Sequence, residues 1–484
     1  MAKKKSVAKN YIYNLIYQLL TIITPLITTP YVARVLGVKN NGIYGYTLSI
    51  LTYFVLIASL GTAMYGQREI AYVQDDKEKQ SRVFWEINYI KLISFLITGL
   101  IYGLLFCISG KYAIYYRILL FELFANMIDI SWYFQGIEEF KKTVVRNTIV
   151  KIIGLVLIFL LVKTRFDLWK YFLIYVLADF LGNLSLWAYV PKYLSKNVKE
   201  KNLKKHLKPI ILLFLPQIAI QVYAVLDKTM IGQILNDMNS VAYYDQSQKI
   251  VKALLLIVCA MSAVISSRVA NSYAKKNYNE IKKNLKGSIS MVWLLAIPMI
   301  FGIIATSNVL VPIYFGPGYE KVISLMNWFT IIIIVIGLNN ITGIQYLIQV
   351  EKQKEFTTSV TVGALVNVIL NFILISKIGV EGAIFSSIVS EICVLAVQLF
   401  YTRDVIKIKD IITPSCKYLA SGIIMYILLY FIKGYLNISI VSLMIEIIIG
   451  AIIYLLVLLL IKDKFLYSIL NQILNSIKIK KGTK

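Results

Sequence analysis

The chain has 484 residues, of which 58% are hydrophobic, and its formal net charge is +26. In a soluble protein this charge would suggest nucleic-acid binding, but here the basic residues separate long apolar stretches, so nucleic acid is not an expected partner. Four cysteines without paired spacing, and no phosphate-binding glycine loop, argue against a disulfide framework, a metal site and nucleotide hydrolysis.

Fourteen apolar stretches follow one another along the chain. Each has about 20 residues or more, which is enough to cross a hydrocarbon core of roughly 30 Å. They lie near residues 11–33, 42–65, 83–109, 113–137, 143–162, 167–190, 208–232, 240–265, 287–307, 322–350, 356–376, 379–401, 412–432 and 437–461. The pattern predicts an all-α polytopic membrane protein with about 14 transmembrane helices.

The basic residues are distributed unequally over the gaps between these stretches. Thirty-six of the 51 Lys and Arg residues lie in or beside alternate gaps, starting with the N-terminal tail, and nine lie in the other gaps. Because Lys- and Arg-rich loops remain in the cytoplasm, both termini are predicted to be cytoplasmic. The lysines are also expected to meet anionic membrane lipids there.

The longest and most basic gap, residues 191–208, follows the sixth stretch and contains the only histidine, His206, which is not expected to bind a metal. We predict a six-helix lobe with a basic linker at 1–205, a second six-helix lobe at 206–403, and two appended helices with a basic tail at 404–484. Two lobes with an even number of spans are parallel repeats, and in transporters the interface of such repeats carries the substrate path.

Short motifs of the two halves resemble each other. Gly42–Tyr46 follows the first stretch much as Asn239–Tyr244 follows the seventh. Trp132–Gln135 and Tyr346–Gln349 each precede a short polar gap and a slender apolar stretch. These correspondences favour an internal repeat.

Polar residues inside the apolar stretches are candidates for function, since a charge at mid-membrane costs about 2.5–3.5 kcal/mol on insertion scales. In stretch 208–232, Gln217, Gln221 and Lys228 share one helical face. Asp227 lies one residue away from that face. The alternative to a functional role is that Asp227 and Lys228 neutralise each other near the outer surface.

The next stretch carries a second polar stripe. Asp245, Lys249 and Lys252 are spaced so that they share one face, and Asp245 can pair with Lys249. The excess of positive charge suits an anionic substrate. The alternative is that these residues lie in water at the outer end of the helix.

Stretch 113–137 carries two acids on one stripe, which consists of Glu122, Asn126, Asp129 and Tyr133. Desolvated carboxyl groups can exchange protons or bind Na⁺, so Glu122 and Asp129 are the best candidates for ion coupling. Asp227 and Asp245 are further candidates. A purely structural contact to Arg117 or Lys151 is the alternative.

Several motifs resemble those of the bacterial oligosaccharide (Wzx-type) flippases, polysaccharide transporters of the multidrug/oligosaccharidyl-lipid/polysaccharide exporter superfamily. They are Thr29–Gly37 (TPYVARVLG), Gly42–Tyr46 (GIYGY), Gly66–Ala71 (GQREIA), Asp129–Gly136 (DISWYFQG), Leu215–Gln217 (LPQ) and Tyr223–Gly232 (YAVLDKTMIG). The resemblance covers at least the first 350 residues. It implies a two-lobed fold of fourteen helices.

The resemblance also implies a function. It indicates alternating-access transfer of undecaprenyl-pyrophosphate-linked oligosaccharide from the inner to the outer leaflet of the bacterial cytoplasmic membrane. The expected partners are this lipid-linked oligosaccharide and the polymerase and assembly proteins of surface polysaccharide synthesis. No cofactor is expected beyond a proton or sodium gradient.

Such a substrate needs cations for its pyrophosphate and amides for its sugar hydroxyls. The proposed phosphate contacts are Arg34, Arg68, Lys228, Lys249 and Lys252, and the proposed sugar contacts are Gln217, Gln221, Asn126 and Gln135. Arg68 could instead anchor the chain at the cytoplasmic interface.

Four alternatives remain open. A lipid II flippase of the same superfamily would share the fold and differ in the glycan. A cation-coupled multidrug antiporter would be expected to have an anionic cavity, whereas the stripes here are cationic. A membrane glycan polymerase or ligase would need a large outer loop, but the longest outer gap, about 307–321, is short, so no enzymatic activity is expected. The fourth alternative is a scaffold protein for a polysaccharide assembly complex.

Overall fold

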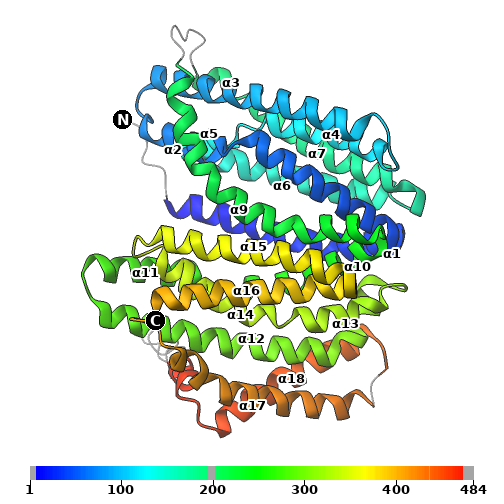
Figure 1. The fold of residues 1–484 in the computed structure, drawn as a ribbon, viewed down its shortest axis with the longest axis vertical. Coiled ribbons are helices and arrows are strands. Elements are labelled where there is room, and N and C mark those ends of the chain that lie inside the picture. The colour runs from blue at the N-terminus through cyan, green and yellow to red at the C-terminus, as the bar shows by residue number, and fades with distance from the viewer. Residues whose placement is uncertain (1–6, 195–201, 435–436, 472–484) are drawn as a thin grey trace, which may run out of the picture. The chain divides into compact units, whose positions relative to one another are not determined.

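The computed structural model describes residues 7–194, 202–434 and 437–471, without the side chains of residues 7–22, 213, 215–220 and 222–224. These residues are helical almost throughout, and no strand occurs among them (Figure 1). The chain divides into two compact units, Met1–Ala242 and Tyr243–Lys484, which are called unit 1 and unit 2 below. The predicted all-α class is confirmed.

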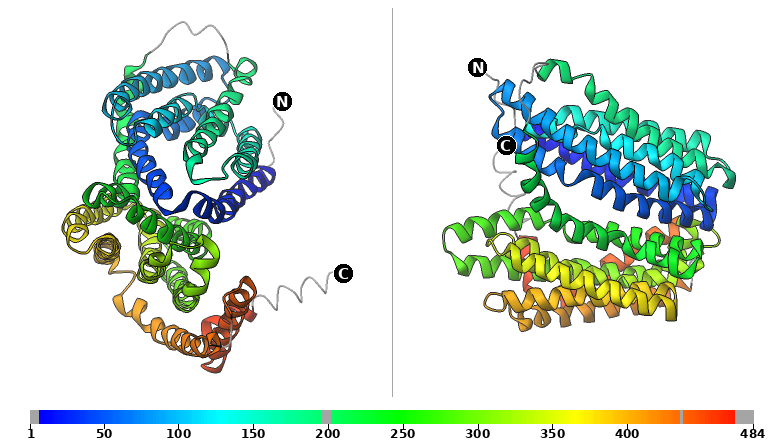
Figure 2. Two further views of the ribbon diagram at one scale, coloured as in Figure 1. Left: turned by 90° about the vertical axis from the view of Figure 1, so that its right-hand side faces the viewer. Right: turned by 45° about the horizontal axis from the view of Figure 1, so that its top comes forward.

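Unit 1 consists of helices that run side by side, as Figure 2 shows. Its elements are α1 (Val7–Ser59), α2 (Thr62–Tyr72), α3 (Lys77–Tyr102), the π-helix η1 (Gly103–Cys107), α4 (Ala113–Met127), α5 (Ser131–Gly136), α6 (Phe140–Leu161), the 3₁₀-helix η2 (Arg165–Asp167), α7 (Leu168–Trp187), α8 (Val190–Tyr193), α9 (Lys204–Leu235) and the start of α10 (Met238–Val258). The closest helix pairs include α4 with α7, α6 with α7, and α2 with α5.

Unit 2 continues α10 and adds a second set of helices. They are α11 (Ser262–Ala274), α12 (Tyr278–Phe315), α13 (Glu320–Phe329), α14 (Ile332–Asn339), the π-helix η3 (Asn340–Leu347), α15 (Gln353–Ile378), α16 (Val380–Thr402), α17 (Ile408–Lys433) and α18 (Ile440–Leu460). Helix α15 packs on α16, and the last pair, α17 and α18, packs on α12.

Ten helices of the described residues are long and apolar enough to cross a membrane, and an eleventh crossing results if the bent pair α10 and α11 is one span. The protein is therefore a multi-pass membrane protein. The count of fourteen remains a prediction. One difference arises in α4, because the predicted stretch 113–137 is broken at residues 128–130 and leaves α4 with 15 residues.

Helix α1 combines the first two predicted stretches. Its 53 residues would extend about 80 Å as one straight helix, more than twice the hydrocarbon thickness. Gly37 interrupts it with φ 74° and ψ 174°, a conformation that a residue with a Cβ atom rarely adopts. The chain turns back at this glycine (Figure 1), so the two predicted stretches lie on either side of it.

The break between α4 and α5 leaves backbone carbonyl groups without helical partners inside the unit. Three side chains donate hydrogen bonds to them: Asn183 to the Ala125 oxygen (2.8 Å), the Trp187 indole to the Ile128 oxygen (2.7 Å) and Lys91 to the Asp129 oxygen (2.6 Å). Hydrocarbon provides no substitute donors, so these bonds are what allow α5 to leave the line of α4.

The second arm of α1 packs closely against the end of α9 and the start of α10. A Cβ atom on Gly42 would lie 1.7 Å from the Met238 oxygen, and one on Gly232 would lie 2.3 Å from the Tyr46 ring. The Ser49 hydroxyl is 2.8 Å from that of Thr229. Because α9 packs on α1 in this way, it belongs to unit 1, although the predicted lobe boundary falls before it. The division into two six-helix lobes that repeat each other remains a prediction.

The two motifs Trp132–Gln135 and Tyr346–Gln349 are followed by the same kind of turn, which also closes helices at Lys276 and Lys462. After α5, Glu138 adopts φ 57° and the Glu139 amide donates to the Phe134 oxygen (2.7 Å). After η3, Glu351 adopts φ 63° and the Lys352 amide donates to the Leu347 oxygen (2.9 Å). Both turns close a helix with a left-handed residue and a six-to-one hydrogen bond.

The helix break generates a testable prediction. Replacing Trp187 with Phe removes the only part of the indole that donates to the Ile128 oxygen, and a buried carbonyl left without a donor costs about 1–3 kcal/mol. We expect the thermal unfolding midpoint of the purified protein in detergent to fall. Trp85→Phe is the matched control, since Trp85 lies 6.2 Å from Trp187 in the same aromatic group and its indole makes no hydrogen bond to a described residue. Equal midpoints for the two variants would contradict the argument.

Candidate functional site

Two glycine contacts bring α2 and α5 close together in unit 1. A Cβ atom on Gly66 would lie 2.5 Å from the Trp132 ring, and one on Gly136 would lie 2.8 Å from the Gln67 oxygen. Small residues at such positions allow backbones to approach. The two motifs that contain these glycines therefore pack on each other.

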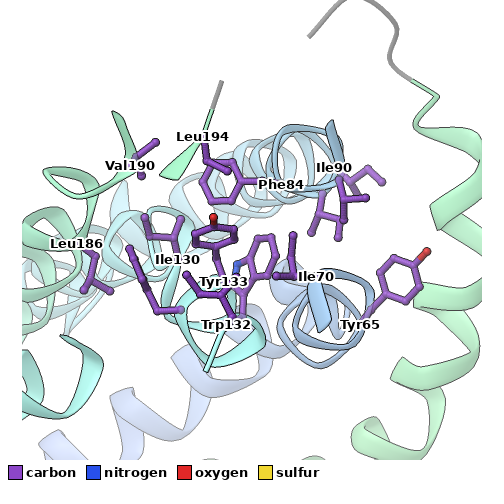
Figure 3. Close-up of a cluster of buried hydrophobic side chains, with 14 of the residues drawn as sticks. Tyr65, Ile70, Phe84, Ile90, Ile130, Trp132, Tyr133, Leu186, Val190 and Leu194 are labelled. Atoms are coloured by element: carbon purple, nitrogen blue, oxygen red, sulfur yellow. The ribbon is translucent and has the colours of Figure 1, made fainter. Parts of the chain in front are cut away.

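An aromatic cluster holds α5 in place (Figure 3). The Phe84 ring of α3 stacks on Trp132 with centroids 5.7 Å apart and meets Tyr133 edge-on at 5.2 Å. The Tyr133 hydroxyl donates to the Gln80 side chain at 3.1 Å. Trp132 and Tyr133 are fully buried, so the side chains next to them on α5 have fixed positions.

A polar cavity of about 540 Å³ opens beside this packing. We call it the glutamine cavity, and it is lined by Ser59, Gly61, Ala63, Met64, Gln67, Ser131, Trp132, Gln135 and Gln221. Its volume is in the range of small-molecule sites. Its polar groups are amides and hydroxyls, which can both donate and accept hydrogen bonds.

The cavity brings together two of the predicted sugar contacts, Gln135 and Gln221. It also contains Gln67 and Trp132, which were not predicted as contacts although both belong to motifs of the resemblance. The side chain of Gln217 lies outside the described residues. Asn126 does not line the cavity, because its amide donates to the Glu122 carboxylate at 2.8 Å.

The predicted phosphate contacts of unit 1 lie elsewhere. Arg68 is exposed on α2, where it pairs with Glu69 at 3.2 Å and lies over the rings of Tyr65 and Tyr72. Arg34 is exposed on α1 and Lys228 is half-buried on α9. None of these three basic residues lines the glutamine cavity.

The predicted stripe on α10 is present in unit 2. Asp245 is buried and pairs with Lys249 at 2.7 Å, as its spacing predicted. Lys249 and Lys252 are exposed. In unit 1 Asp227 is buried beside Lys228, and Tyr53 lies near its charge.

The predicted ion-coupling stripe is divided by the helix break. The Asp129 carboxylate accepts from the backbone amide and the hydroxyl of Ser131, both at 2.9 Å, and lies 4.0 Å from Arg146. It therefore stabilises the start of α5. The alternative partner Arg117 donates to the Cys107 oxygen instead (2.8 Å).

Glu122 has a different acidic neighbour, Asp179 of α7. The two carboxyl groups interact electrostatically, and Arg146 and Lys151 act on Asp179. Glu122 is 4% exposed, and its carboxyl group faces that of Asp179. Asp179 was not predicted as part of this site, because it lies on another helix. Among the described residues no group of three His, Cys, Asp or Glu side chains could hold a metal ion.

His206 is not in a loop, as the sequence suggested, but in the first turn of α9, where it is buried. Its Nε2 atom lies 2.8 Å from the Glu86 carboxylate and its Nδ1 atom 2.7 Å from the Tyr65 hydroxyl. Lys205 also pairs with Glu86, at 3.1 Å. Because a carboxylate only accepts, Nε2 donates to Glu86, and Nδ1 and the Tyr65 hydroxyl form a second hydrogen bond. This network attaches α9 to α2 and α3.

Unit 2 contains a cavity of a different character. The apolar groove, of about 420 Å³, lies between α10, α12, α17 and α18 and is lined mainly by Leu, Ile and Met. Its charged member is Glu446, which is 2% exposed, and neither of its carboxyl oxygens has a hydrogen-bond partner among the described residues.

Comparisons with known proteins agree with this architecture. The family model described as "Polysaccharide biosynthesis protein" matches residues 7–267, and the model for the lipid II flippase MurJ matches residues 139–449. A protein named as an O-antigen transporter in Escherichia coli (strain K12) is 25% identical over 421 residues, which cover 83% of this chain and 98% of the relative.

Solved structures share the fold. The lipid II flippase MurJ in an inward closed conformation has a TM-score of 0.73 at 17% identity, with 94% of this chain and 99% of that chain covered. An inward-facing multidrug resistance transporter of the MATE family has a TM-score of 0.66 at 15% identity, with 80% and 94% covered. Because a family model matches more than half of its residues, the chain belongs to the polysaccharide biosynthesis protein family, the Wzx-type flippases of the multidrug/oligosaccharidyl-lipid/polysaccharide exporter superfamily.

Proposed function

We propose that the protein is a flippase that moves an undecaprenyl-pyrophosphate-linked oligosaccharide from the inner to the outer leaflet by alternating access. The observation that carries this proposal is the glutamine cavity. Three glutamines, two serines and a tryptophan line it, and several polar side chains that converge in one cavity are typical of a ligand site. Amides and hydroxyls both donate and accept hydrogen bonds, so they can pair with sugar hydroxyls.

The other parts of the substrate need other surfaces. The polyprenyl tail is apolar and can remain in the hydrocarbon of the bilayer while the headgroup crosses. The proposed contacts for the pyrophosphate remain Arg34, Arg68, Lys228, Lys249 and Lys252. Transfer between leaflets makes and breaks no covalent bond, so we propose no catalytic residue.

The charge distribution supports the direction of transport. We propose that both termini are in the cytoplasm of a bacterium, which places the basic loops at the leaflet where lipid-linked oligosaccharides are assembled. Polymerase and assembly proteins of surface polysaccharide synthesis are the proposed protein partners.

We further propose that Glu122 and Asp179 couple transport to a cation gradient. Desolvation and mutual repulsion make it costly for both carboxyl groups to be ionised at once, so the pair is suited to exchanging a proton or binding a cation, although Arg146 and Lys151 also act on Asp179. Asp129 and the buried acids Asp227 and Asp245 remain candidates, although Asp129 accepts hydrogen bonds from Ser131 and Asp245 pairs with Lys249.

A lipid II flippase is the second candidate, because the MurJ family model matches residues 139–449. Its substrate carries the same pyrophosphate and tail with a different glycan. A multidrug antiporter is favoured only by the fold.

Flipping in proteoliposomes tests the main proposal. Undecaprenyl-pyrophosphate oligosaccharide is placed in both leaflets, and a membrane-impermeant glycosidase is added outside. We expect the protected inner pool to become accessible only in vesicles that contain the protein. If the pool stays protected while lipid II or a labelled drug cation moves, the substrate assignment is wrong.

The glutamine cavity makes a prediction about the headgroup. Gln67→Leu and Gln135→Leu each remove hydrogen bonds worth about 1 kcal/mol, so flipping should slow about fivefold for each. Gln353→Leu is the control, because Gln353 is exposed at the start of α15. Equal rates for all three variants would show that the cavity does not hold the sugar.

The acid pair makes a prediction about coupling. Glu122→Gln should keep the fold and make flipping insensitive to an imposed proton or sodium gradient, because the amide neither releases a proton nor carries a charge. Asp129→Asn should lower the unfolding midpoint and leave the gradient dependence unchanged. Flipping rates with and without each gradient distinguish the variants. An unchanged gradient response in Glu122→Gln would rule out the pair as the coupling site.

A further inference from the structure

A second cavity of unit 1, separate from the glutamine cavity, opens between α6 and α7. Its volume is about 730 Å³, and it shares no residue with the glutamine cavity. We call it the α6–α7 groove. Lys141, Lys142 and Arg146 line one end together with one acid, Glu139, and the remainder is mainly apolar.

Neighbouring side chains fix the basic end of the groove. The Lys142 ammonium lies 3.8, 4.8 and 5.3 Å from the ring centroids of Tyr193, Tyr189 and Phe134, and it donates to the Tyr193 hydroxyl. Aromatic rings hold a cation without neutralising its charge. The three rings and the hydroxyl therefore fix the position of this lysine.

Arg146 is fixed as well. Its guanidinium donates to the Asn183 side-chain oxygen at 2.6 Å and lies 4.0 Å from Asp129. Gly182 of α7 leaves space for it, since a Cβ atom there would lie 3.3 Å from Nη1 of Arg146 and 2.8 Å from Val150. The groove thus depends on a glycine at the point where the two helices meet.

The apolar part of the groove forms a line along α6. Val145, Ile149 and Ile153 are spaced by four residues and so share one face, and all three are exposed, as is Leu181 opposite them. From Lys141 to Ile153 the helix rises about 18 Å, close to half of the hydrocarbon thickness. One acyl chain of a single leaflet has this reach.

We propose that the α6–α7 groove binds an anionic phospholipid of the surrounding bilayer. The phosphate lies between Lys141, Lys142 and Arg146, which can form charge-assisted hydrogen bonds to its oxygens, and one acyl chain follows Val145, Ile149 and Ile153. The gap that contains both lysines belongs to the basic set of gaps, whose side the charge distribution predicts to be cytoplasmic, and basic pockets between helices on that side bind anionic headgroups. The proposal does not depend on what the protein transports.

Native mass spectrometry of the delipidated full-length protein tests the proposal. The protein is titrated with phosphatidylglycerol, with phosphatidylcholine of the same acyl chains, and with undecaprenyl phosphate. We expect at least one site that prefers phosphatidylglycerol to phosphatidylcholine. Lys141→Gln with Lys142→Gln should weaken phosphatidylglycerol binding about fivefold for each lysine removed, and leave phosphatidylcholine binding unchanged.

Two further variants keep the test decisive. Lys282→Gln with Lys283→Gln is the matched control, since these exposed neighbours near the start of α12 carry the same charge outside the groove. Ile149→Trp fills the apolar line without changing charge and should also weaken phosphatidylglycerol binding. Equal losses in the control pair, or no preference for phosphatidylglycerol in the unmodified protein, would overturn the proposal. Tighter binding of undecaprenyl phosphate at the same residues would identify a substrate entry instead.

Discussion

The structure of unit 1 depends on the requirement that backbone polar groups inside a membrane find partners within the protein. Helices meet this requirement along most of the chain. Between α4 and α5 the chain is not helical, and there three side chains supply the missing donors. Lys91, Asn183 and Trp187 come from two other helices, so the break is maintained by tertiary contacts. The direction of α5, and with it the position of Gln135, follows from those contacts.

Glycines then decide how near α5 can lie to α2. Gly66 admits the Trp132 ring and Gly136 admits the backbone of Gln67. Two of the motifs that identify the family are therefore packing motifs, and the polar residues beside the glycines are carried into the cavity as a consequence. A side chain larger than hydrogen at either position would separate the helices and enlarge the cavity.

Much of this could be predicted from the sequence because it is local. Helical periodicity placed Gln221 on a polar face, the resembling motif Asp129–Gly136 contains Gln135, and the spacing of Asp245 and Lys249 predicted their ion pair. The partners that join separate helices could not be predicted in this way. Asp179 lies 57 residues from Glu122, and nothing in either sequence neighbourhood indicates that α4 and α7 pack together. His206 looked like part of a basic loop because the residues around it are lysines, yet its ring is buried against Glu86 and Tyr65. Fourteen spans were counted from hydropathy, which does not register a break such as that at residues 128–130.

Arg146 connects these features. It donates to Asn183, whose amide in turn donates to the Ala125 oxygen at the helix break, and it lies near Asp129, which stabilises the start of α5. It also acts electrostatically on Asp179, the partner of Glu122. The same guanidinium forms part of the basic end of the α6–α7 groove. A phosphate bound there would draw positive charge away from Asp129 and Asp179 together, because one side chain serves both acids. The lipid composition of the membrane would then affect the acid pair and the position of α5 without any contact between the lipid and the glutamine cavity.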